Sequence, residues 1–242
     1  VATVAKENDD KVIINGKKSF VLNGKEADII IVPARTSGSQ TETEGISLFV
    51  VESDLPGISK NNYKSVDGHS ASEITFKNVE VNKDNLLGEI GKGYQTLEST
   101  IDDATLAVCA EATGIMKSLH DKTVEYSKNR VQFGVPIGGF QALQHRMVDT
   151  LMACEETESI LLWALTTNQD DSSSLKKAIS GLKYQIGTAG KHVGQEAVQL
   201  HGGMGISWEL DIAHFFKRLS SIEILFGNAD FHMKRFLTLS NN

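Results

Sequence analysis

The chain has 242 residues, of which 40% are hydrophobic and 23% charged, and this composition excludes a disordered chain. Its 31 acidic residues outnumber its 24 basic ones, and the formal net charge of −7 argues against general binding to nucleic acid or anionic lipid. Apolar runs stay well below the ~18 residues that a membrane-spanning helix needs. We therefore expect no nucleic acid partner and no membrane span.

Cysteine usage and the first residues give two further expectations. Cys109 and Cys154 lie far apart in the sequence, which argues against a disulfide framework and predicts reduced, buried thiols in a cytoplasmic protein. The chain begins with Val1 instead of Met and enters strand-like sequence at once, so we expect a truncated form of a longer protein.

Residues 1–88 alternate short β-rich runs with turn signals and predict a partial antiparallel β domain, a barrel or sandwich. Two Asn-Gly pairs, Asn15-Gly16 and Asn23-Gly24, each follow an apolar run and favour the tight turn of a hairpin. Further strands are expected at residues 28–32, 46–51, 73–76 and 79–81, with an exposed polar loop at residues 36–45.

Residues 89–242 change to apolar spacings of three and four, which predict amphipathic helices. The pattern is clearest from Leu175 to Leu200, over about seven helical turns. Similar spacing predicts helices over residues 97–119, 143–161 and 212–226, and the segment from Asp170 to Ser174 is expected to form a loop and cap. The predicted fold is therefore α+β, with an up-and-down four-helix bundle after the β domain.

Generic catalytic and metal-binding signatures are absent from the sequence, so we expect no metal site. There is no nucleophile elbow, P-loop, H-E-x-x-H or Cys-x-x-Cys motif. His192 and Glu196 share a helix face, which is typical of a structural pair. The glycine cluster at residues 202–205 follows a helix and, taken alone, indicates a helix C-cap and turn.

Two longer segments carry a more specific signal. Residues 130–145 read RVQFGVPIGGFQALQH, and residues 197–206 read AVQLHGGMGI. They closely resemble the R-x-Q-F-G-x-P-I…F-Q-x-x-Q-H and Q-x-x-G-G-x-G signatures of the acyl-CoA dehydrogenase family. The resemblance extends over the whole chain in the family's order, although the family's N-terminal helical domain and the first part of its β domain have no counterpart.

This resemblance implies an FAD site that the two segments complete for a neighbouring subunit, and hence a homo- or hetero-oligomer, a dimer or tetramer. The side chains suit such a ligand, since the fixed fork of Arg130 fits a diphosphate and the glycines let the backbone approach a flat or charged group. The residues that the resemblance assigns to cofactor binding are Arg130, Phe133, Gln141, Gln199, Gly202 and Gly203. The alternative interpretation is a solvent-exposed helix hairpin with a capping turn.

The family's catalytic carboxylate has no counterpart at either of its usual positions. Abstraction of the α-proton of an acyl thioester needs a carboxylate within hydrogen-bond reach. The position after the fourth helix is Gly227, and the alternative position on the first helix is Ala104. Asp103 beside it is a candidate, although an acidic pair near a helix start is typical of a structural feature. Glu223 and Asp230 are further candidates, although such residues are typically surface charges.

Other departures resemble the small-subunit branch of the family, to which the small subunit of pimeloyl-CoA dehydrogenase belongs. Phe20 stands where the family has a flavin-covering Trp, and Leu22 where it has a hydrogen-bonding Thr.

Two functions follow from this resemblance. One is an FAD-dependent acyl-CoA dehydrogenase, as a fragment or subunit, that desaturates the α,β bond of an acyl-CoA and passes electrons to an electron-transferring flavoprotein. The other is a non-catalytic subunit that completes the flavin site of a heteromeric dehydrogenase.

Overall fold

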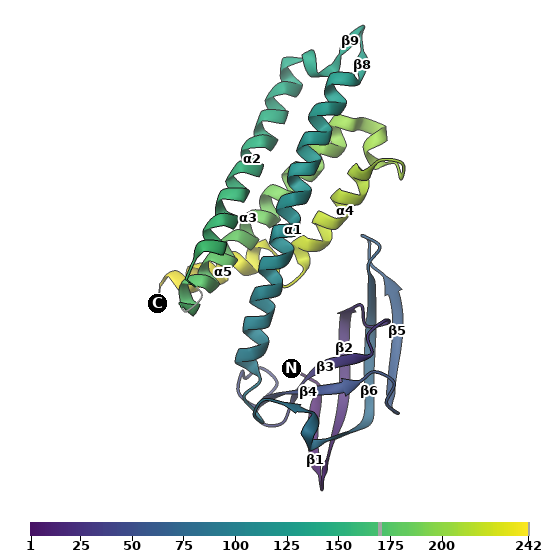
Figure 1. Ribbon diagram of the computed structural model, residues 1–242, viewed down its shortest axis with the longest axis vertical. Coiled ribbons are helices and arrows are strands. Elements are labelled where there is room, and N and C mark those ends of the chain that lie inside the picture. The colour runs from purple at the N-terminus through teal and green to yellow at the C-terminus, as the bar shows by residue number, and fades with distance from the viewer. Residues whose placement is uncertain (169–170, 242) are drawn as a thin grey trace. The chain divides into compact units, whose positions relative to one another are not determined.

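The computed structural model describes residues 1–168 and 171–241, which form two compact units (Figure 1). The β unit comprises Val1–Thr100 and the helical unit Ile101–Asn242. Helix α1 (Tyr94–Asn129) begins in the first and continues through the second. The domain boundary predicted from the sequence, after residue 88, stays a prediction.

The β unit contains a seven-stranded sheet with the strand order β5-β6-β2-β1-β3-β4-β7. All neighbouring strands are antiparallel except β1 and β3, which run parallel where Val4 lies opposite Arg35. The strands are β1 (Val4–Asn8), β2 (Lys11–Leu22), β3 (Ile29–Arg35), β4 (Ile46–Glu52), β5 (Ile58–Lys64), β6 (Ser70–Asn82) and β7 (Leu86–Leu87). The short 3₁₀ turn η1 (Lys83–Asn85) joins β6 to β7.

The hairpin turn predicted at Asn15-Gly16 is wrong, because β2 runs straight through this pair. The pair forms an irregularity opposite β6, where the Asn15 Oδ1 atom accepts the backbone N–H of Asn78 at 2.8 Å. A Cβ atom at Gly16 would lie 2.6 Å from the Cα atom of Thr3, so close backbone approach explains this glycine. The turn between β1 and β2 lies instead at residues 9–10.

The second Asn-Gly pair does form a turn, at residues 23–26, but β2 and β3 on either side of it are not paired. Strand β1 lies in the strand-like sequence expected after Val1, whereas β5 was not predicted from the sequence. Strand β5 reads ISKNNYK and has little apolar alternation because it is an edge strand that pairs only with β6. The two short strands predicted at residues 73–76 and 79–81 are parts of β6.

The core of the β unit follows from alternation along the central strands. Buried positions recur at every second residue along parts of β2, β3 and β6, as strand geometry requires when one face is covered. Strand β4 differs, because its first four residues are all buried. The largest of these buried side chains are Ile14, Phe49, Ile74 and Phe76.

Arg35, at the end of β3, organises the predicted polar loop 36–45. The side chain is 6% exposed, and its guanidinium donates only to backbone carbonyls. The acceptors are the carbonyl oxygens of Val1, Ser37, Gln40, Glu42 and Glu44, at 2.6 to 3.4 Å. One buried cation thus satisfies carbonyls that this loop would otherwise leave unpaired.

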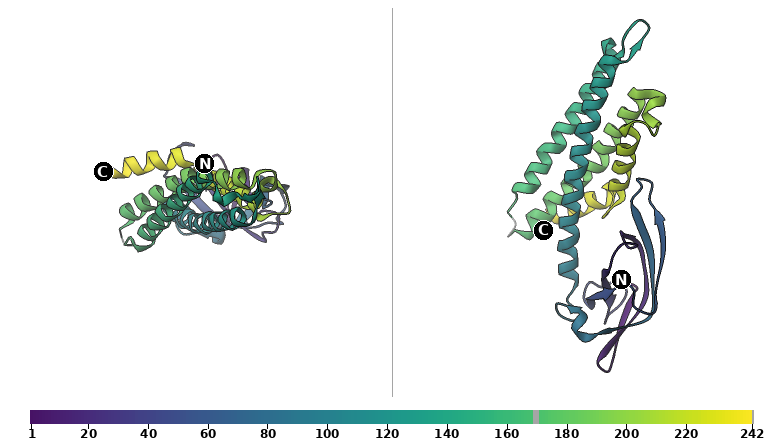
Figure 2. Two further views of the ribbon diagram at one scale, coloured as in Figure 1. Left: turned by 90° about the horizontal axis from the view of Figure 1, so that it is seen from above. Right: turned by 45° about the vertical axis from the view of Figure 1, so that its right-hand side comes forward.

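The helical unit contains the four predicted helices and a fifth. Besides α1, these are α2 (Gln141–Thr166), α3 (Ser172–His201), α4 (Asp211–Ile224) and α5 (Ala229–Ser240). Figures 1 and 2 show α2 beside the part of α1 that leads to the hairpin of β8 (Val131–Gln132) and β9 (Val135–Pro136). Asp170, predicted to begin a capping loop, lies outside the described residues, whereas the Asp171 side chain caps α3 by accepting the N–H of Ser174 at 3.1 Å.

Helix α3 packs against α2, α4 and α5 and supplies much of the core. Glycines allow this close packing, because a Cβ atom at Gly187 would lie 2.8 Å from that of Ala229, and one at Gly194 would lie 2.8 Å from the Phe216 ring. The thiols of Cys109 and Cys154 are buried and unbridged, as predicted. Burial raises their pKa to about 12 and about 11, respectively, so neither is a reactive thiolate.

Among the described residues, each helix is too short or too polar to cross a membrane.

The Arg35 network predicts a specific loss of stability. Arg35→Met leaves several loop carbonyls without a donor, so we expect the free energy of unfolding to fall by about 2–4 kcal/mol. Urea denaturation measures this fall, and limited proteolysis is expected to cut within residues 36–45. Lys11→Met is the matched control, since this lysine forms an exposed pair with Glu80 and is expected to change stability by under ~1 kcal/mol. Equal stability of the two variants would contradict the structural role of Arg35.

Candidate functional site

The first predicted site segment forms a small hairpin between α1 and α2. Strands β8 (Val131–Gln132) and β9 (Val135–Pro136) pair across a two-residue turn, Phe133–Gly134. Both turn residues have positive φ, 53° and 81°, which is the geometry of a type I′ turn. A left-handed conformation costs a non-glycine residue roughly 1–2 kcal/mol, yet it leaves the Phe133 side chain 93% exposed. Such a strained, exposed aromatic is a candidate for binding.

The base of this hairpin is fixed on α1. The Ile137 N–H donates to the Arg130 carbonyl at 2.8 Å, and the Ile137 side chain is buried. A Cβ atom at Gly138, within the 3₁₀ turn η2 (Ile137–Gly139), would lie 2.9 Å from the Ser127 Oγ atom, so this position needs glycine. The Gln144 side chain donates to the Gly138 carbonyl at 2.8 Å. The hairpin is therefore a rigid extension of the helix pair.

The second predicted segment ends α3 and forms the 3₁₀ turn η3 (Gly202–Ile206). Gly202 has a φ of 61° and terminates the helix. A Cβ atom at Gly202 or at Gly203 would meet nothing within 4 Å, so the exposed backbone there faces open space. At Gly205, by contrast, a Cβ atom would lie 2.6 Å from the Val198 carbonyl oxygen. Packing explains only the last of these glycines.

Contacts within the helical unit bring the two segments together. The Tyr126 ring, one turn before Arg130, stacks on the His201 ring with a centroid distance of 4.2 Å. Burial lowers the pKa of His201, which favours the neutral ring in this stack. Farther along, Arg146 of α2 pairs with Glu196 of α3 at 2.5 Å. The ends of α1 and α3 and the start of α2 are therefore held as one surface.

All six predicted cofactor-binding residues are exposed, and they lie at or beside the hairpin, at the start of α2 or at the end of α3. Arg130 directly follows α1, and among the described residues no hydrogen bond or ion pair of its guanidinium is found. The other positions are Phe133 in the hairpin turn, Gln141 at the start of α2, Gln199 in the last turn of α3, and Gly202 and Gly203 in η3. Their role in binding stays a prediction.

Asp102 and Asp103, the acidic pair on α1, differ in burial, since Asp102 is buried and Asp103 is not. The Asp102 carboxylate accepts two hydrogen bonds from the Arg235 guanidinium of α5, at 2.5 and 2.7 Å. Asp103 is exposed. Asp102 is thus a structural anchor, and only its neighbour is open to a substrate.

The loop between α4 and α5 is held by buried polar groups that the sequence did not reveal. Phe226 and Gly227 have positive φ values of 58° and 104°. Lys183 of α3 is fully buried, and its Nζ atom donates to the carbonyls of Glu223 and Gly227, both at 2.8 Å. Its position on the apolar face of α3 was the one available signal, because a lysine there needs a buried acceptor.

His232 of α5 holds the same loop. Its Nε2 atom lies 3.0 Å from the Phe226 carbonyl, so this nitrogen carries the proton that is donated. The Nδ1 atom is buried, with no hydrogen-bond partner among the described residues. Burial, with Lys183 and Arg235 nearby, lowers the pKa of His232 to about 4.

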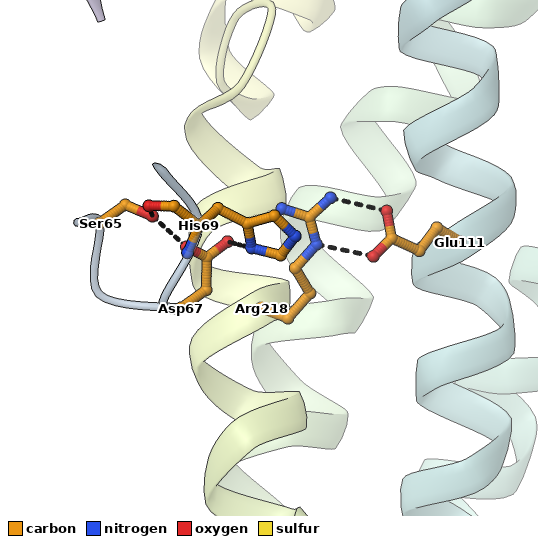
Figure 3. Close-up of polar contacts among 5 residues, drawn as sticks. All are labelled: Ser65, Asp67, His69, Glu111 and Arg218. Carbon is orange, nitrogen blue, oxygen red and sulfur yellow. Dashed lines mark hydrogen bonds and ion pairs between the residues drawn. The ribbon is translucent and has the colours of Figure 1, made fainter. Parts of the chain in front are cut away.

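Two polar clusters in Figure 3 have structural explanations. In the turn between β5 and β6, the Asp67 carboxylate accepts the Ser65 hydroxyl and lies 3.2 Å from the His69 Nδ1 atom. The carboxylate stands between serine and histidine, so this trio is not arranged for nucleophilic catalysis. In the helical unit, Arg218 of α4 binds Glu111 of α1 through two hydrogen bonds of 2.6 and 2.7 Å.

A cavity of about 460 Å³ lies between α3 and α4 in the helical unit. Lys191, Gln195 and Glu223 supply polar lining, and Phe216 and Leu219 supply apolar lining. In the part of the chain that the structure describes, no three His, Cys, Asp or Glu side chains are grouped so as to hold a metal ion.

Family models match both units. Residues 91–237 match the acyl-CoA dehydrogenase C-terminal domain, and residues 1–79 match the acyl-CoA dehydrogenase middle domain. The chain belongs to the acyl-CoA dehydrogenase family.

Curated relatives agree with this family. The chain is 33% identical to the short-chain specific acyl-CoA dehydrogenase of Megasphaera elsdenii, over 93% of this chain and 59% of the relative. It is 30% identical to the caffeyl-CoA reductase-Etf complex subunit CarC of Acetobacterium woodii, over 90% of this chain and 58% of the relative. The chain thus spans about three fifths of the length of the curated relatives it matches.

Solved structures share the fold. Butyryl-CoA dehydrogenase from Megasphaera elsdenii aligns with a TM-score of 0.85 and 31% identity, over 99% of this chain and 63% of the other. An FAD-dependent dehydrogenase aligns with a TM-score of 0.92 and 27% identity, over 98% of this chain and 65% of the other.

The buried His232 predicts a pH dependence of stability. Its pKa is about 4 in the folded chain and ~6.5 in the unfolded chain, so between these values only the unfolded chain binds the proton. Stability therefore falls as the pH drops from about 6.5 towards 4, by up to ~3 kcal/mol. Urea denaturation across this range measures the fall.

The His232→Gln variant keeps a donor for the Phe226 carbonyl but cannot be protonated in this range, so we expect a shallower pH dependence. His192→Gln, at an exposed position of α3, is the matched control. If both variants follow the same pH profile as the unsubstituted chain, the assignment of this titration to His232 is contradicted.

Proposed function

We propose that this chain supplies the middle and C-terminal parts of an FAD-dependent acyl-CoA dehydrogenase that desaturates the α,β bond of an acyl-CoA thioester. The observation that carries the proposal is the surface shared by the hairpin and the end of α3. There an unpaired guanidinium, an exposed aromatic side chain and bare glycine backbone lie at one end of the helical unit.

The residues of this surface fit the nucleotide part of FAD, the cofactor that membership of the family implies. The rigid fork of Arg130 can bind the diphosphate oxygens in a bidentate manner. The open space at Gly202 and Gly203 allows a ligand to approach the backbone, where any side chain would intrude. Gln199 adds an amide that both donates and accepts hydrogen bonds, and Gln141 adds a second.

A bound FAD would supply the acceptor for the hydride that leaves the β-carbon of the substrate. The protein must then supply a base for the α-proton. The loop at residues 225–228 contains no carboxylate, and Asp103 is the exposed acid next to the other family position. We assign Asp103 as the candidate base of this chain.

The second candidate function is a non-catalytic subunit that completes the flavin site of a catalytic partner. Two observations favour it: the missing carboxylate at Gly227, and Leu22, which cannot donate the hydrogen bond of the family's threonine. Phe20 retains an aromatic ring, with a φ of 53°, near the Tyr63 ring at 6.4 Å. The resemblance to the small-subunit branch stays a prediction.

The partners follow from the same proposal. We expect an acyl-CoA substrate, an electron-transferring flavoprotein as electron acceptor, and a homo- or hetero-oligomer with flavin held between subunits. The similarity to a subunit of an Etf complex supports the second of these partners. The free, buried cysteines support a cytoplasmic location.

Removal of the Arg130 side chain tests the flavin site. We expect Arg130→Ala to lower the stoichiometry of bound FAD at least tenfold, because the diphosphate loses its charged donor. The visible absorption spectrum of the purified protein, with chromatography of the released cofactor, measures FAD content. Lys128→Ala is the control, since this exposed lysine at the end of α1 faces Glu125 at 3.9 Å. Unchanged FAD content in Arg130→Ala would refute the site.

Substitution of the two aspartates separates catalysis from stability. Asp103→Asn is expected to leave FAD content unchanged and to slow butyryl-CoA oxidation by roughly 100-fold or more, as loss of a general base does. Asp102→Asn is expected to lower the free energy of unfolding by about 3 kcal/mol, because Arg235 loses a buried partner. Dye-coupled turnover and urea denaturation measure the two effects. Undiminished turnover of Asp103→Asn would show that Asp103 is not the base.

A further inference from the structure

Trp208 is an exposed aromatic side chain that is nevertheless held in one orientation. It follows η3, and 74% of the residue is exposed. The Lys217 ammonium lies 3.7 Å from the centre of its ring, and the His214 ring meets it at 5.2 Å with an interplanar angle of 62°. Lys217 and His214 both come from α4, so a rigid helix positions the indole.

The Lys217 contact is a cation–π interaction, worth about 0.5–1 kcal/mol at an exposed site. It holds a large aromatic ring that forfeits most of the burial that normally stabilises such a side chain. Because 74% of the residue stays exposed beside Lys217 and His214, aromatic surface remains on which a flat ligand can stack.

The indole belongs to the surface described above. Trp208 follows η3 by two residues, and this turn begins at Gly202 and is about 10 Å long at ~2 Å per residue. Gln199 lies in the last helical turn before η3, and Arg130 is joined to this end of α3 by the stack of Tyr126 on His201. An aromatic ring, an amide, open backbone and a guanidinium are thus carried by the end of α3 and the segments joined to it.

We propose that Trp208 is the stacking platform for the adenine ring of the flavin dinucleotide. The inference rests on the proposed function, since it assigns the adenosine half of the same ligand whose diphosphate Arg130 binds. Adenine fits this position because stacking on an aromatic face needs no hydrogen-bond pattern, and Gln199 can add edge contacts. A protein docked on the indole is the other class of occupant, and the tests below distinguish it.

The two tryptophans of the chain allow a direct optical test. Trp163→Phe leaves Trp208 as the only indole, and we expect ADP to quench its fluorescence with a saturable curve. Trp208→Phe leaves Trp163, which lies in α2 and is 44% exposed, as the matched control in which ADP has no such effect. Inorganic pyrophosphate, which has no base, is expected to quench neither. Equal responses of the two variants to ADP would overturn the proposal.

FAD affinity gives the second test, by equilibrium dialysis with the 242-residue chain. Trp208→Leu is expected to weaken FAD binding roughly 10- to 100-fold and riboflavin binding by less than threefold, because riboflavin has no adenine. Trp208→Phe is expected to restore most of the FAD affinity.

The outcomes separate the two hypotheses. If the unsubstituted chain binds no FAD, both the proposed function and this inference fail. If it binds FAD and Trp208→Leu binds it equally well, only the adenine platform fails. A smaller native mass of Trp208→Leu with unchanged ADP affinity would also overturn the platform, and would assign Trp208 to a protein interface.

Discussion

The helical unit depends on the close packing of α3, which contacts α2, α4 and α5 along its length. Such contacts require small residues at the crossings, and Gly187 and Gly194 provide them where Ala229 and Phe216 press against the helix. The same helix carries Lys183, a fully buried cation whose charge is stabilised by two backbone carbonyls of the neighbouring loop. Packing and loop geometry are therefore coupled through one helix, because Lys183 can reach those carbonyls only when α4 and α5 lie against it.

The candidate site lies at the end of α3, so the close packing of this helix also fixes the position of the site. Its two segments lie about 70 residues apart in the sequence, yet the stack of Tyr126 on His201 and the pair of Arg146 with Glu196 hold them together. Exposed residues on a fixed framework bind with little loss of conformational entropy. This is the physical reason to treat the strained Phe133 turn and the open glycines as binding features rather than as loose surface.

Local patterns predicted the helices well, because apolar spacing over many turns is a redundant signal, and the resemblance pointed to the segments that form the exposed surface. The local sequence patterns predicted the strands less well than the helices. Asn15-Gly16 resembles a hairpin turn in sequence, but whether such a pair turns or bulges depends on its neighbours, here Thr3 and Asn78. Arg35 and Lys183 donate hydrogen bonds to backbone carbonyls. Every residue type has such a carbonyl, so the sequence does not indicate which residues accept these bonds.

The chain has residues that suit a dinucleotide but no carboxylate in the loop at residues 225–228, and this difference bears on its function. The surface that we propose for a dinucleotide combines open backbone with the Arg130 guanidinium, which has no partner among the described residues, whereas the loop at residues 225–228 contains no carboxylate. That loop is nonetheless held by Lys183 and His232 in a strained conformation, and strain persists only where surrounding contacts enforce it. A residue such as Phe226 gains by leaving positive φ, so the contacts of Lys183 and His232 hold the loop against this tendency. The enforced strain makes the loop a candidate to face a ligand or a subunit, and in our proposal the proton-accepting group comes from Asp103 or from another part of the assembly.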